Sequence, residues 1–209
     1  KTKNDLLFIS SVASSKSPLY SSAYGEQGYT NAISYFEMNN TLFKNLDIKT
    51  INKIYFRGHP HVKDVKYKDY VIDDYFYLKD YMSQFKKIDY NANTSAVDLI
   101  LKSKLVIINY LSTPWLQSLI ANVPTIILVN KKTYFFDAKY QNIFNDLEKN
   151  NIIFFCPILA AKFINKINGD PFKWWKIKQV QEARKNFLNS NFMINERLSN
   201  YLLDLSKNT

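Results

Sequence analysis

The chain has 209 residues, of which 46% are hydrophobic and 22% charged, values typical of a folded globular domain with a sizeable core. Its net charge of +10 indicates either a solvated basic surface or attraction to anionic substrates and lipid head groups. The lysines are scattered and form no nucleic-acid-binding motif, so we expect no nucleic-acid partner. The single cysteine, Cys156, excludes an intramolecular disulfide, and no apolar run reaches the roughly 20 residues that span a bilayer.

Strand-like and helix-like segments alternate along the chain. Continuous apolar runs are typical of buried parallel strands, and apolar spacings of three and four residues are typical of helices. In chain order the sequence predicts a strand at 6–10, a loop at 12–28, a helix at 30–46, a strand at 53–57, no clear element at 61–88, a helix at 95–104, a strand at 105–109, a helix at 112–122, a strand at 124–129, a helix at 134–150, a strand at 152–155, and helices at 160–167, 171–189 and 195–206. In the helix at 30–46, one face is predicted to carry Ile33, Phe36 or Glu37, Asn40, and Phe43 with Lys44, and Thr30 is predicted as the N-cap.

Strands separated by helices predict right-handed βαβ units. We therefore expect an α/β fold with a Rossmann-like parallel sheet flanked by helices, formed by residues 1–170. Residues 171–209 are expected to form C-terminal helices that pack on this domain or on an N-terminal domain that precedes the chain. Ligands bind such sheets outside the carboxyl ends of the strands, which directs attention to the loops that follow Ser11, Arg57, Asn109 and Asn130.

A helix start follows the strand that ends at Asn109. Ser112 and Thr113 open this helix, where free backbone N–H groups and the positive end of the helix dipole favour an anion. Pro114 in the first turn sacrifices no hydrogen bond. Ordinary capping by Ser112 or Thr113 is the alternative interpretation.

A second polar segment, residues 57–60, ends the strand at 53–57. Arg57 offers a planar fork for phosphate, Gly58 allows a ligand to approach the backbone, and His59 can donate to phosphate. The alternative is a turn that carries a surface histidine.

Residues 112–125 resemble the nucleotide-sugar-binding segment of GT-B glycosyltransferases. In that pattern a Ser/Thr-rich helix start holds phosphate, an acidic residue in the helix holds the ribose hydroxyls, and a small residue with proline opens the next strand. Here Gln117 stands at the acidic position, and its uncharged amide is a weaker acceptor. The resemblance also implies that the loop after Ser10 and Ser11 faces a cleft between two domains. Residues 57–60 are similar to a segment of capsule-type and cytidylate-sugar transferases in which the histidine contacts the nucleotide phosphate.

Nearly the whole chain resembles a family of transferases assigned to bacterial surface-carbohydrate biosynthesis. The most specific feature is the pair Trp174 and Trp175 ahead of a helix with Gln181, Ala183 and Arg184. Stacking on carbohydrate and anchoring at a membrane surface are alternatives to core packing, which the helical spacing of the tryptophans favours. The other matching segments are 6–11, 25–29, 56–60, 112–125 and 160–161.

The resemblance implies transfer of a sugar from a nucleotide-activated donor onto a cell-surface glycan or its lipid-linked precursor. We expect Arg57 and His59 to be catalytic, and the donor to be bound by Ser10, Ser11, Arg57, His59, Asn109, Ser112, Thr113 and Gln117. The catalytic base is expected in the preceding domain, so the chain alone should be inactive. A nucleotide-sugar epimerase of the same architecture and a non-catalytic nucleotide- or glycan-binding domain are the alternative functions.

We expect neither a metal nor a cofactor. Asp73, Asp74 and Asp80 have no second cluster at ligand spacing along the chain. The expected location is cytoplasmic, with peripheral contact to the anionic inner face of the cell membrane through the basic charge.

Overall fold

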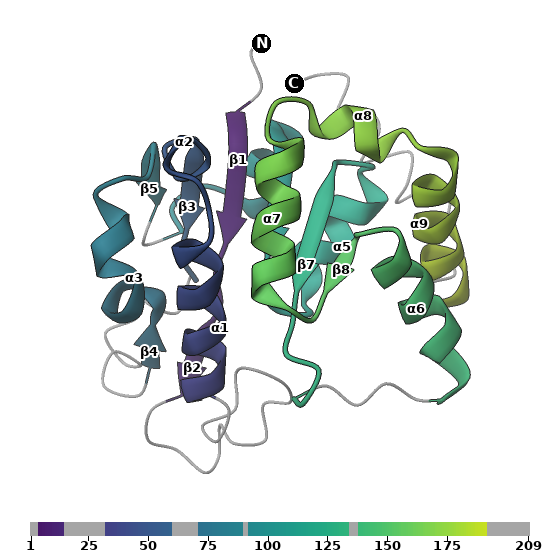
Figure 1. The fold of residues 1–209 in the computed structure, drawn as a ribbon, viewed down its shortest axis with the longest axis horizontal. Coiled ribbons are helices and arrows are strands. Elements are labelled where there is room, and N and C mark those ends of the chain that lie inside the picture. The colour runs from purple at the N-terminus through teal and green to yellow at the C-terminus, as the bar shows by residue number, and fades with distance from the viewer. Residues whose placement is uncertain (1–3, 15–31, 60–70, 90–91, 134–137, 192–209) are drawn as a thin grey trace.

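The computed structural model describes residues 4–14, 32–59, 71–89, 92–133 and 138–191 (Figure 1). The helix predicted at 195–206, the proposed N-cap Thr30 and most of the loop predicted at 12–28 lie outside these ranges.

A parallel sheet forms the centre of the molecule and confirms the predicted α/β fold. Within the described residues it has six strands, in the order β5-β3-β1-β6-β7-β8. The strands are β1 (Asn4–Ile9), β3 (Ile54–Arg57), β5 (Lys87–Asp89), β6 (Ser103–Ile108), β7 (Thr125–Leu128) and β8 (Ile153–Phe154). Except in β5, the apolar residues of the strands are buried because helices cover both faces of the sheet.

The order in which the chain adds strands to the sheet changes direction at β1. From β1 it proceeds outward to β3 and β5, and it then returns past β1 to form β6, β7 and β8. Ile9, the last residue of β1, pairs with Arg57 on one side and with Ile108 on the other. The carboxyl ends of β3, β1 and β6 therefore lie side by side at a topological switch point, where α/β sheets bind ligands.

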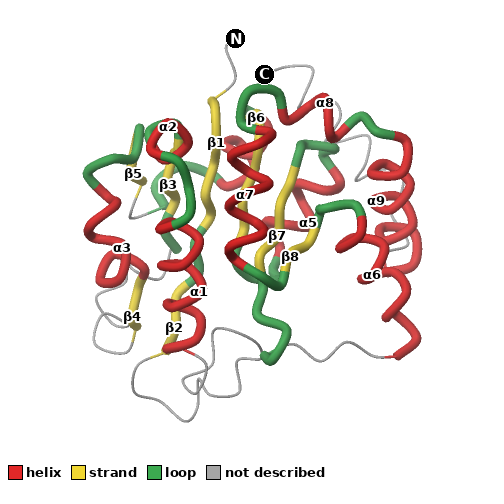
Figure 2. Tube along the Cα trace, in the orientation of Figure 1, coloured by secondary structure: helices red, strands yellow, loops and turns green. Residues whose placement is uncertain are grey.

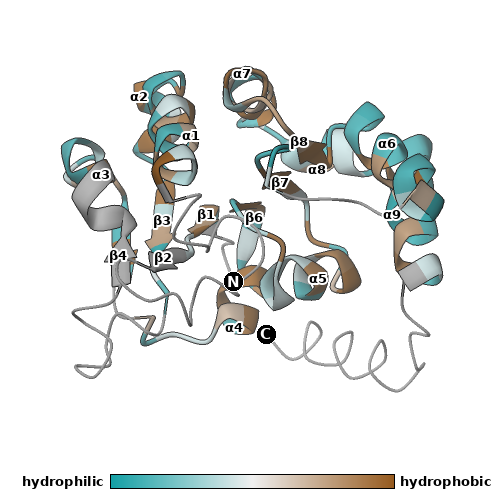
Figure 3. Ribbon diagram, turned by 90° about the horizontal axis from the view of Figure 1, so that it is seen from below, coloured by the Kyte–Doolittle hydropathy of each residue, from teal (hydrophilic) through white to brown (hydrophobic). Residues whose placement is uncertain are grey.

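Helices form a layer on each side of the sheet (Figure 3). One face carries α1 (Ala32–Lys44), α2 (Ile48–Ile51), α3 (Asp74–Met82) and α7 (Pro157–Ile167), and the other carries α4 (Ala96–Leu101) and α5 (Thr113–Ile120). Near β8 lie the 3-10 helix η5 (Ala138–Tyr140), α6 (Gln141–Lys149) and α9 (Lys178–Asn191), and α9 packs against both α5 and α6. No described helix has both the length and the apolar composition needed to cross a membrane.

Aromatic rings fill the space between the sheet and α1. Phe8 on β1 lies 5.0 Å from Phe43 on α1 and 5.8 Å from Phe56 on β3, measured between ring centroids. Phe56 in turn stacks on Phe85 at 5.6 Å. All four rings are buried, and each burial stabilises the fold by about 1.5–3 kcal/mol. This cluster holds α1 firmly against β1 and β3, and so fixes the α1 side chains that reach the carboxyl edge.

The face predicted for α1 includes both buried and exposed residues. Ile33 is 71% exposed and Asn40 is also exposed, whereas Phe43 is buried as expected. Tyr35 and Asn39 face the sheet instead, because their polar atoms form hydrogen bonds with groups at its carboxyl edge. Apolar spacing alone does not detect such an arrangement.

A second, two-stranded sheet lies where the sequence predicts no strand (Figure 2). It pairs β2 (Val12–Ser14) with β4 (Val71–Asp73) in antiparallel register. β2 falls within the predicted loop at 12–28, whereas β4, α3 and β5 fall within or at the end of residues 61–88. Strands of three residues are too short to produce a recognisable alternation of apolar side chains.

The single helix predicted at 171–189 is two helices, α8 (Pro171–Trp175) followed by α9. Trp174 donates from Nε1 to the Asn150 carbonyl at 3.1 Å, and Trp175 donates from Nε1 to the Asn122 carbonyl at 3.0 Å. Both indoles are buried, so they pack as their spacing favours and are not an exposed stacking surface. Because Asn122 and Asn150 precede β7 and β8, this contact lies at the amino edge of the sheet, opposite the switch point.

Arg184 on α9 also serves the scaffold. Its guanidinium is buried and donates from Nη1 to the carbonyl of Leu119 in the last turn of α5 at 2.6 Å. The Leu119 carbonyl also accepts from the Asn122 N–H, so Arg184 adds a second donor and complements the negative end of the helix dipole.

Candidate functional site

Polar residues lie side by side where β1, β3 and β6 end, at the lower edge of the sheet in Figure 1. The Ser10 N–H donates to the Arg57 carbonyl at 3.0 Å and extends the β1–β3 ladder by one residue. Ile9 pairs with Ile108, so Asn109 follows β6 at the level where Ser10 follows β1. The loops after these strands therefore share one edge, as a Rossmann-like sheet requires.

The hydroxyl of Tyr35 joins these strands to α1. Its oxygen accepts from the Ser11 N–H at 3.1 Å and from Nδ2 of Asn109 at 2.7 Å. Nδ2 of Asn109 also donates to Oδ1 of Asn39 at 3.1 Å. All four residues are buried, and the neighbouring hydroxyl of Ser10 donates to the Ser11 carbonyl. The side chain of Asn109 is thus held in place from α1.

Among the described residues, two buried side-chain oxygen atoms have no hydrogen-bond partner. They are Oδ1 of Asn109, a residue that is 0% exposed, and Oγ of Ser112. An unpaired buried polar atom costs about 1–3 kcal/mol, so proteins keep few of them and each calls for an explanation, such as a functional role. Both atoms belong to the segment between β6 and α5, which therefore has capacity for further polar contacts.

This segment ends at a helix N-terminus that can bind an anion. Ser112 is the N-cap of α5, with φ −153° and ψ −177°, but its hydroxyl makes no capping hydrogen bond. Capping therefore does not account for Ser112. The first backbone N–H groups of a helix lack intrahelical acceptors and carry the positive end of the dipole. Thr113 is exposed at this end, and Gln117 lies half-buried one turn further on.

Arg57 lies on the other side of β1 and is largely engaged with the backbone. Its side chain donates from Nε to the Thr94 carbonyl at 3.1 Å and from Nη1 to the Gly58 carbonyl at 3.5 Å, and the residue is only 7% exposed. Burial lowers the pKa of the Arg57 guanidinium, while the nearby Tyr110 and Asp89 side chains act in the opposite direction. The charge of Arg57 therefore interacts with Tyr110, the residue after Asn109, although Nε and Nη1 already donate to backbone carbonyls.

Asp89, at the end of β5, is a site residue that sequence patterns do not reveal. Its two carboxylate oxygens accept from the Asn93 and Thr94 N–H groups, each at 2.8 Å. Burial raises the pKa of Asp89, but hydrogen bonds from Thr94 and Asn93, with the charge of Arg57, outweigh that effect and hold the pKa below its usual value. β5 contains a single apolar residue, so the strand leaves no signal in the sequence.

His59 continues the chain beyond Arg57 and lies half-buried. The intervening Gly58 donates its N–H to the Asp89 carbonyl at 3.0 Å, which fixes this turn to the end of β5. β1 lies between β3, which leads into this segment, and β6, which leads towards α5. The ends of β3 and β6 are therefore two strand spacings, or about 10 Å, apart.

The predicted site residues thus fall into three neighbouring groups on one edge. Their members are Ser10, Ser11 and Asn109 around Tyr35; Ser112, Thr113 and Gln117 at the start of α5; and Arg57 and His59 beside Asp89. Besides Asp89, the residues at this edge that the sequence did not single out include Tyr35 and Asn39. The available signal was their spacing of four residues on α1, which places two polar groups on one helix face.

Metal-binding geometry is not found in the described part of the chain, where no three His, Cys, Asp or Glu side chains come together. The side chains of Asp73 and Asp74 lie outside the description, so the expectation of metal-independent chemistry stays a prediction.

A model of the LIC12162 transferase family matches residues 1–204. Comparison with curated proteins and with solved structures finds no match. The family match spans every strand of the central sheet and the three groups of residues at its carboxyl edge. The chain therefore belongs to the LIC12162 family of transferases.

Proposed function

We propose that the protein is a glycosyltransferase and that its sheet domain binds a nucleotide-activated sugar donor for the synthesis of a bacterial surface polysaccharide. The observation that carries this proposal is the pair of unpaired buried oxygen atoms, Asn109 Oδ1 and Ser112 Oγ, beside the start of α5 at the switch point. Membership of a transferase family and the order of the strands support it.

The donor phosphates bind at the N-terminus of α5 in this proposal. The hydroxyls of Ser112 and Thr113 and the free N–H groups of the first turn donate to the phosphate oxygens. Oδ1 of Asn109 can only accept, so it takes a hydroxyl or N–H group of the donor. Gln117, one turn into the helix, accepts from the ribose hydroxyls. Ser10 and Ser11, both buried, form the floor of the site between β1 and α1, where the Ser11 N–H is fixed by Tyr35.

The transfer step breaks the bond between the anomeric carbon of the sugar and the phosphate oxygen, which keeps the electron pair. The acceptor hydroxyl forms the new bond to that carbon and releases its proton to a base. The positive end of α5 and the charge of Arg57 stabilise the departing nucleotide, and His59 donates to its phosphate. We place the base in a domain that precedes this chain, so the chain alone should bind the donor without transferring the sugar.

We also propose that this chemistry needs no metal and no cofactor, and that it takes place on the cytoplasmic face of the cell membrane. The acceptor is then a glycan or its lipid-linked precursor. A net charge of +10 favours peripheral contact with anionic lipids at that surface.

Calorimetric titration with uridine and cytidine mono- and diphosphates tests the donor site. We expect micromolar to millimolar dissociation constants, which correspond to roughly 4–8 kcal/mol. Ser112→Ala should weaken binding by about 1–3 kcal/mol, because a hydrogen bond to a charged group is lost. Its melting temperature should hardly change, since the hydroxyl makes no capping bond.

Ser95→Ala is the matched control, because Ser95 is the N-cap of α4 and also makes no side-chain capping bond. This variant should bind nucleotides as the parent protein does. A folded chain that binds none of these nucleotides contradicts the proposed donor site.

A further inference from the structure

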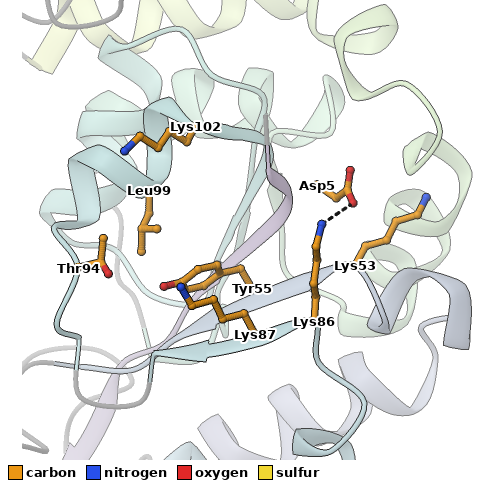
Figure 4. A pocket seen from close by; sticks show the side chains of 8 residues that line it. All are labelled: Asp5, Lys53, Tyr55, Lys86, Lys87, Thr94, Leu99 and Lys102. Carbon is orange, nitrogen blue, oxygen red and sulfur yellow. Dashed lines mark hydrogen bonds and ion pairs between the residues drawn. The ribbon is translucent and has the colours of Figure 1, made fainter. Parts of the chain in front are cut away.

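A pocket of about 330 Å³ begins at Thr94, the residue that bonds to Arg57 and Asp89, and extends towards the amino edge of the sheet (Figure 4). Its lining residues include Asp5 at the start of β1, Lys53 just before β3, Lys87 at the start of β5 and Lys102 just after α4. These positions lie towards the amino edge of the sheet, whereas the donor site is at the carboxyl edge. The volume is at the lower end of the range of small-molecule sites, about 300–1,000 Å³.

The floor of the pocket is largely apolar. Tyr55 on β3 and Leu99 on α4 line it and are both buried. The ammonium group of Lys87 lies 5.1 Å from the centre of the Tyr55 ring, which holds this charge over the floor. In Figure 4, Lys87 and Tyr55 lie between Lys102 at one end of the pocket and Lys53 at the other.

The charges around the pocket do not balance. Four lysines line it, Lys53, Lys86, Lys87 and Lys102, against the single carboxylate of Asp5. Both oxygens of that carboxylate already form ion pairs with lysines.

Lys86 lies 3.3 Å from one oxygen of Asp5, and Lys104, outside the lining, lies 2.8 Å from the other. Lys53 donates to the neutral Oδ1 of Asn168 at 3.1 Å. Among the described residues, neither Lys87 nor Lys102 has a carboxylate partner. The pocket therefore holds excess positive charge that no part of the described chain neutralises.

We propose that this pocket is a second anion site, which binds a phosphate-bearing small molecule or head group through Lys87 and Lys102 with support from Lys86. A multivalent, compact anion suits a pocket with several lysines, because lysine binds phosphate as a point charge with three donors. A diphosphate satisfies more of these groups than a single carboxylate does. The proposal does not rest on the donor site, because none of the proposed donor ligands lines the pocket, although Thr94 in its lining accepts a hydrogen bond from Arg57.

Titration of the full chain with inorganic pyrophosphate tests the proposal. Lys87→Gln with Lys102→Gln should weaken pyrophosphate binding at least about tenfold, and binding to the parent protein should fall as salt is raised. Lys149→Gln with Lys185→Gln removes the same charge from exposed positions on α6 and α9, and this control should bind as the parent does. Because the proposed donor site also takes phosphate, the comparison is repeated in the Ser112→Ala background, where the lysine changes should weaken pyrophosphate binding by the same factor. Circular dichroism of each variant establishes that it is folded.

A second arm uses vesicles of phosphatidylcholine with and without phosphatidylglycerol. Loss of vesicle binding in the Lys87 and Lys102 variant alone identifies a lipid head group as the source of the phosphate, and loss of pyrophosphate binding identifies a soluble ligand. Either result supports the site. Equal binding of both probes to the folded double variant and the parent overturns it, as does the absence of any binding to the parent.

Discussion

Nδ2 of Asn109, in the loop after β6, donates to the hydroxyl oxygen of Tyr35 on α1 at 2.7 Å, across a sequence separation of 74 residues. The same oxygen accepts from the Ser11 N–H after β1. One phenol therefore fixes the ends of two central strands at the switch point, while Oδ1 of Asn109 keeps no partner. The stability of the fold and the geometry of the candidate site depend on the same hydroxyl.

Tyr35→Phe should destabilise the protein by about 1–3 kcal/mol, because it removes the hydroxyl that accepts from the buried Ser11 N–H and from one hydrogen of the Asn109 amide. The same change should weaken nucleotide binding, since Asn109 loses a constraint. Urea denaturation and nucleotide calorimetry measure the two effects. Tyr140→Phe in η5 is the matched control, because no hydrogen bond of the Tyr140 hydroxyl occurs in the described structure. Equal stability of both variants and the parent would show that the Tyr35 hydroxyl does not hold the loops.

Asp89→Asn should lower stability at neutral pH and flatten the loss of stability in acid. Burial raises the pKa of Asp89, but hydrogen bonds from Thr94 and Asn93 and the charge of Arg57 hold it below its usual value. A depressed pKa contributes stability that is complete above the pKa of the unfolded carboxyl, about 3.9, and is lost as pH falls through the folded value. We expect the substitution to lower the free energy of unfolding by about 1–3 kcal/mol at neutral pH, and by less below about pH 4. The midpoints of urea denaturation, measured across this pH range, test this expectation.

Asp5→Asn is the comparison variant for this prediction. The hydrogen bond from Lys104 and the charge of Lys86 lower the pKa of Asp5, against the effect of its partial burial. Its contribution depends on partly exposed lysines, so added salt should reduce it, whereas the backbone contacts of Asp89 should resist salt. An acid profile of Asp89→Asn that is identical to that of the parent would contradict the assignment.

The sheet could be predicted because most of its strands are buried on both faces. β6 and β7 are continuous apolar runs, and the predicted strands at 105–109 and 124–129 overlap them closely. β5 could not be predicted, since two of its three residues are exposed and Ile88 is its only apolar one. The strand order, which creates the switch point, depends on tertiary pairing that no local pattern specifies.

The candidate site could be predicted only where polar residues follow a buried strand. Asn109 and Ser112 stand out for that reason, and both carry unpaired buried oxygen atoms. The role of Tyr35 depends on partners 24 and 74 residues away, so its position on α1 suggests only a core residue. The position of Arg57 at a strand end made it a candidate ligand for phosphate. The sequence could not show that its Nε donates to the Thr94 carbonyl instead.

Nucleotide binding should persist after chelation of divalent metals. The proposed phosphate ligands are hydroxyls and the N–H groups of α5, which need no bridging cation. Calorimetry with the parent protein before and after dialysis against a chelator measures this directly. A strict requirement for magnesium or manganese would contradict a metal-independent site. This test uses conditions in which most of the nucleotide is not bound to metal.

His59→Ala and Trp175→Ala should have opposite effects, because the residues lie at opposite edges of the sheet. His59 is half-buried at the carboxyl edge, and its loss should weaken nucleotide binding by about 1–3 kcal/mol with a smaller effect on folding. Trp175 is 2% exposed and its Nε1 donates to Asn122, so its loss should cost about 3–5 kcal/mol of stability. Below its lowered melting temperature, the Trp175 variant should bind nucleotides normally, since the amino edge does not touch the ligand. Thermal melts and titrations of both variants separate the two roles. If the histidine variant unfolds yet keeps its affinity, and the tryptophan variant does the reverse, the assigned site and scaffold are exchanged.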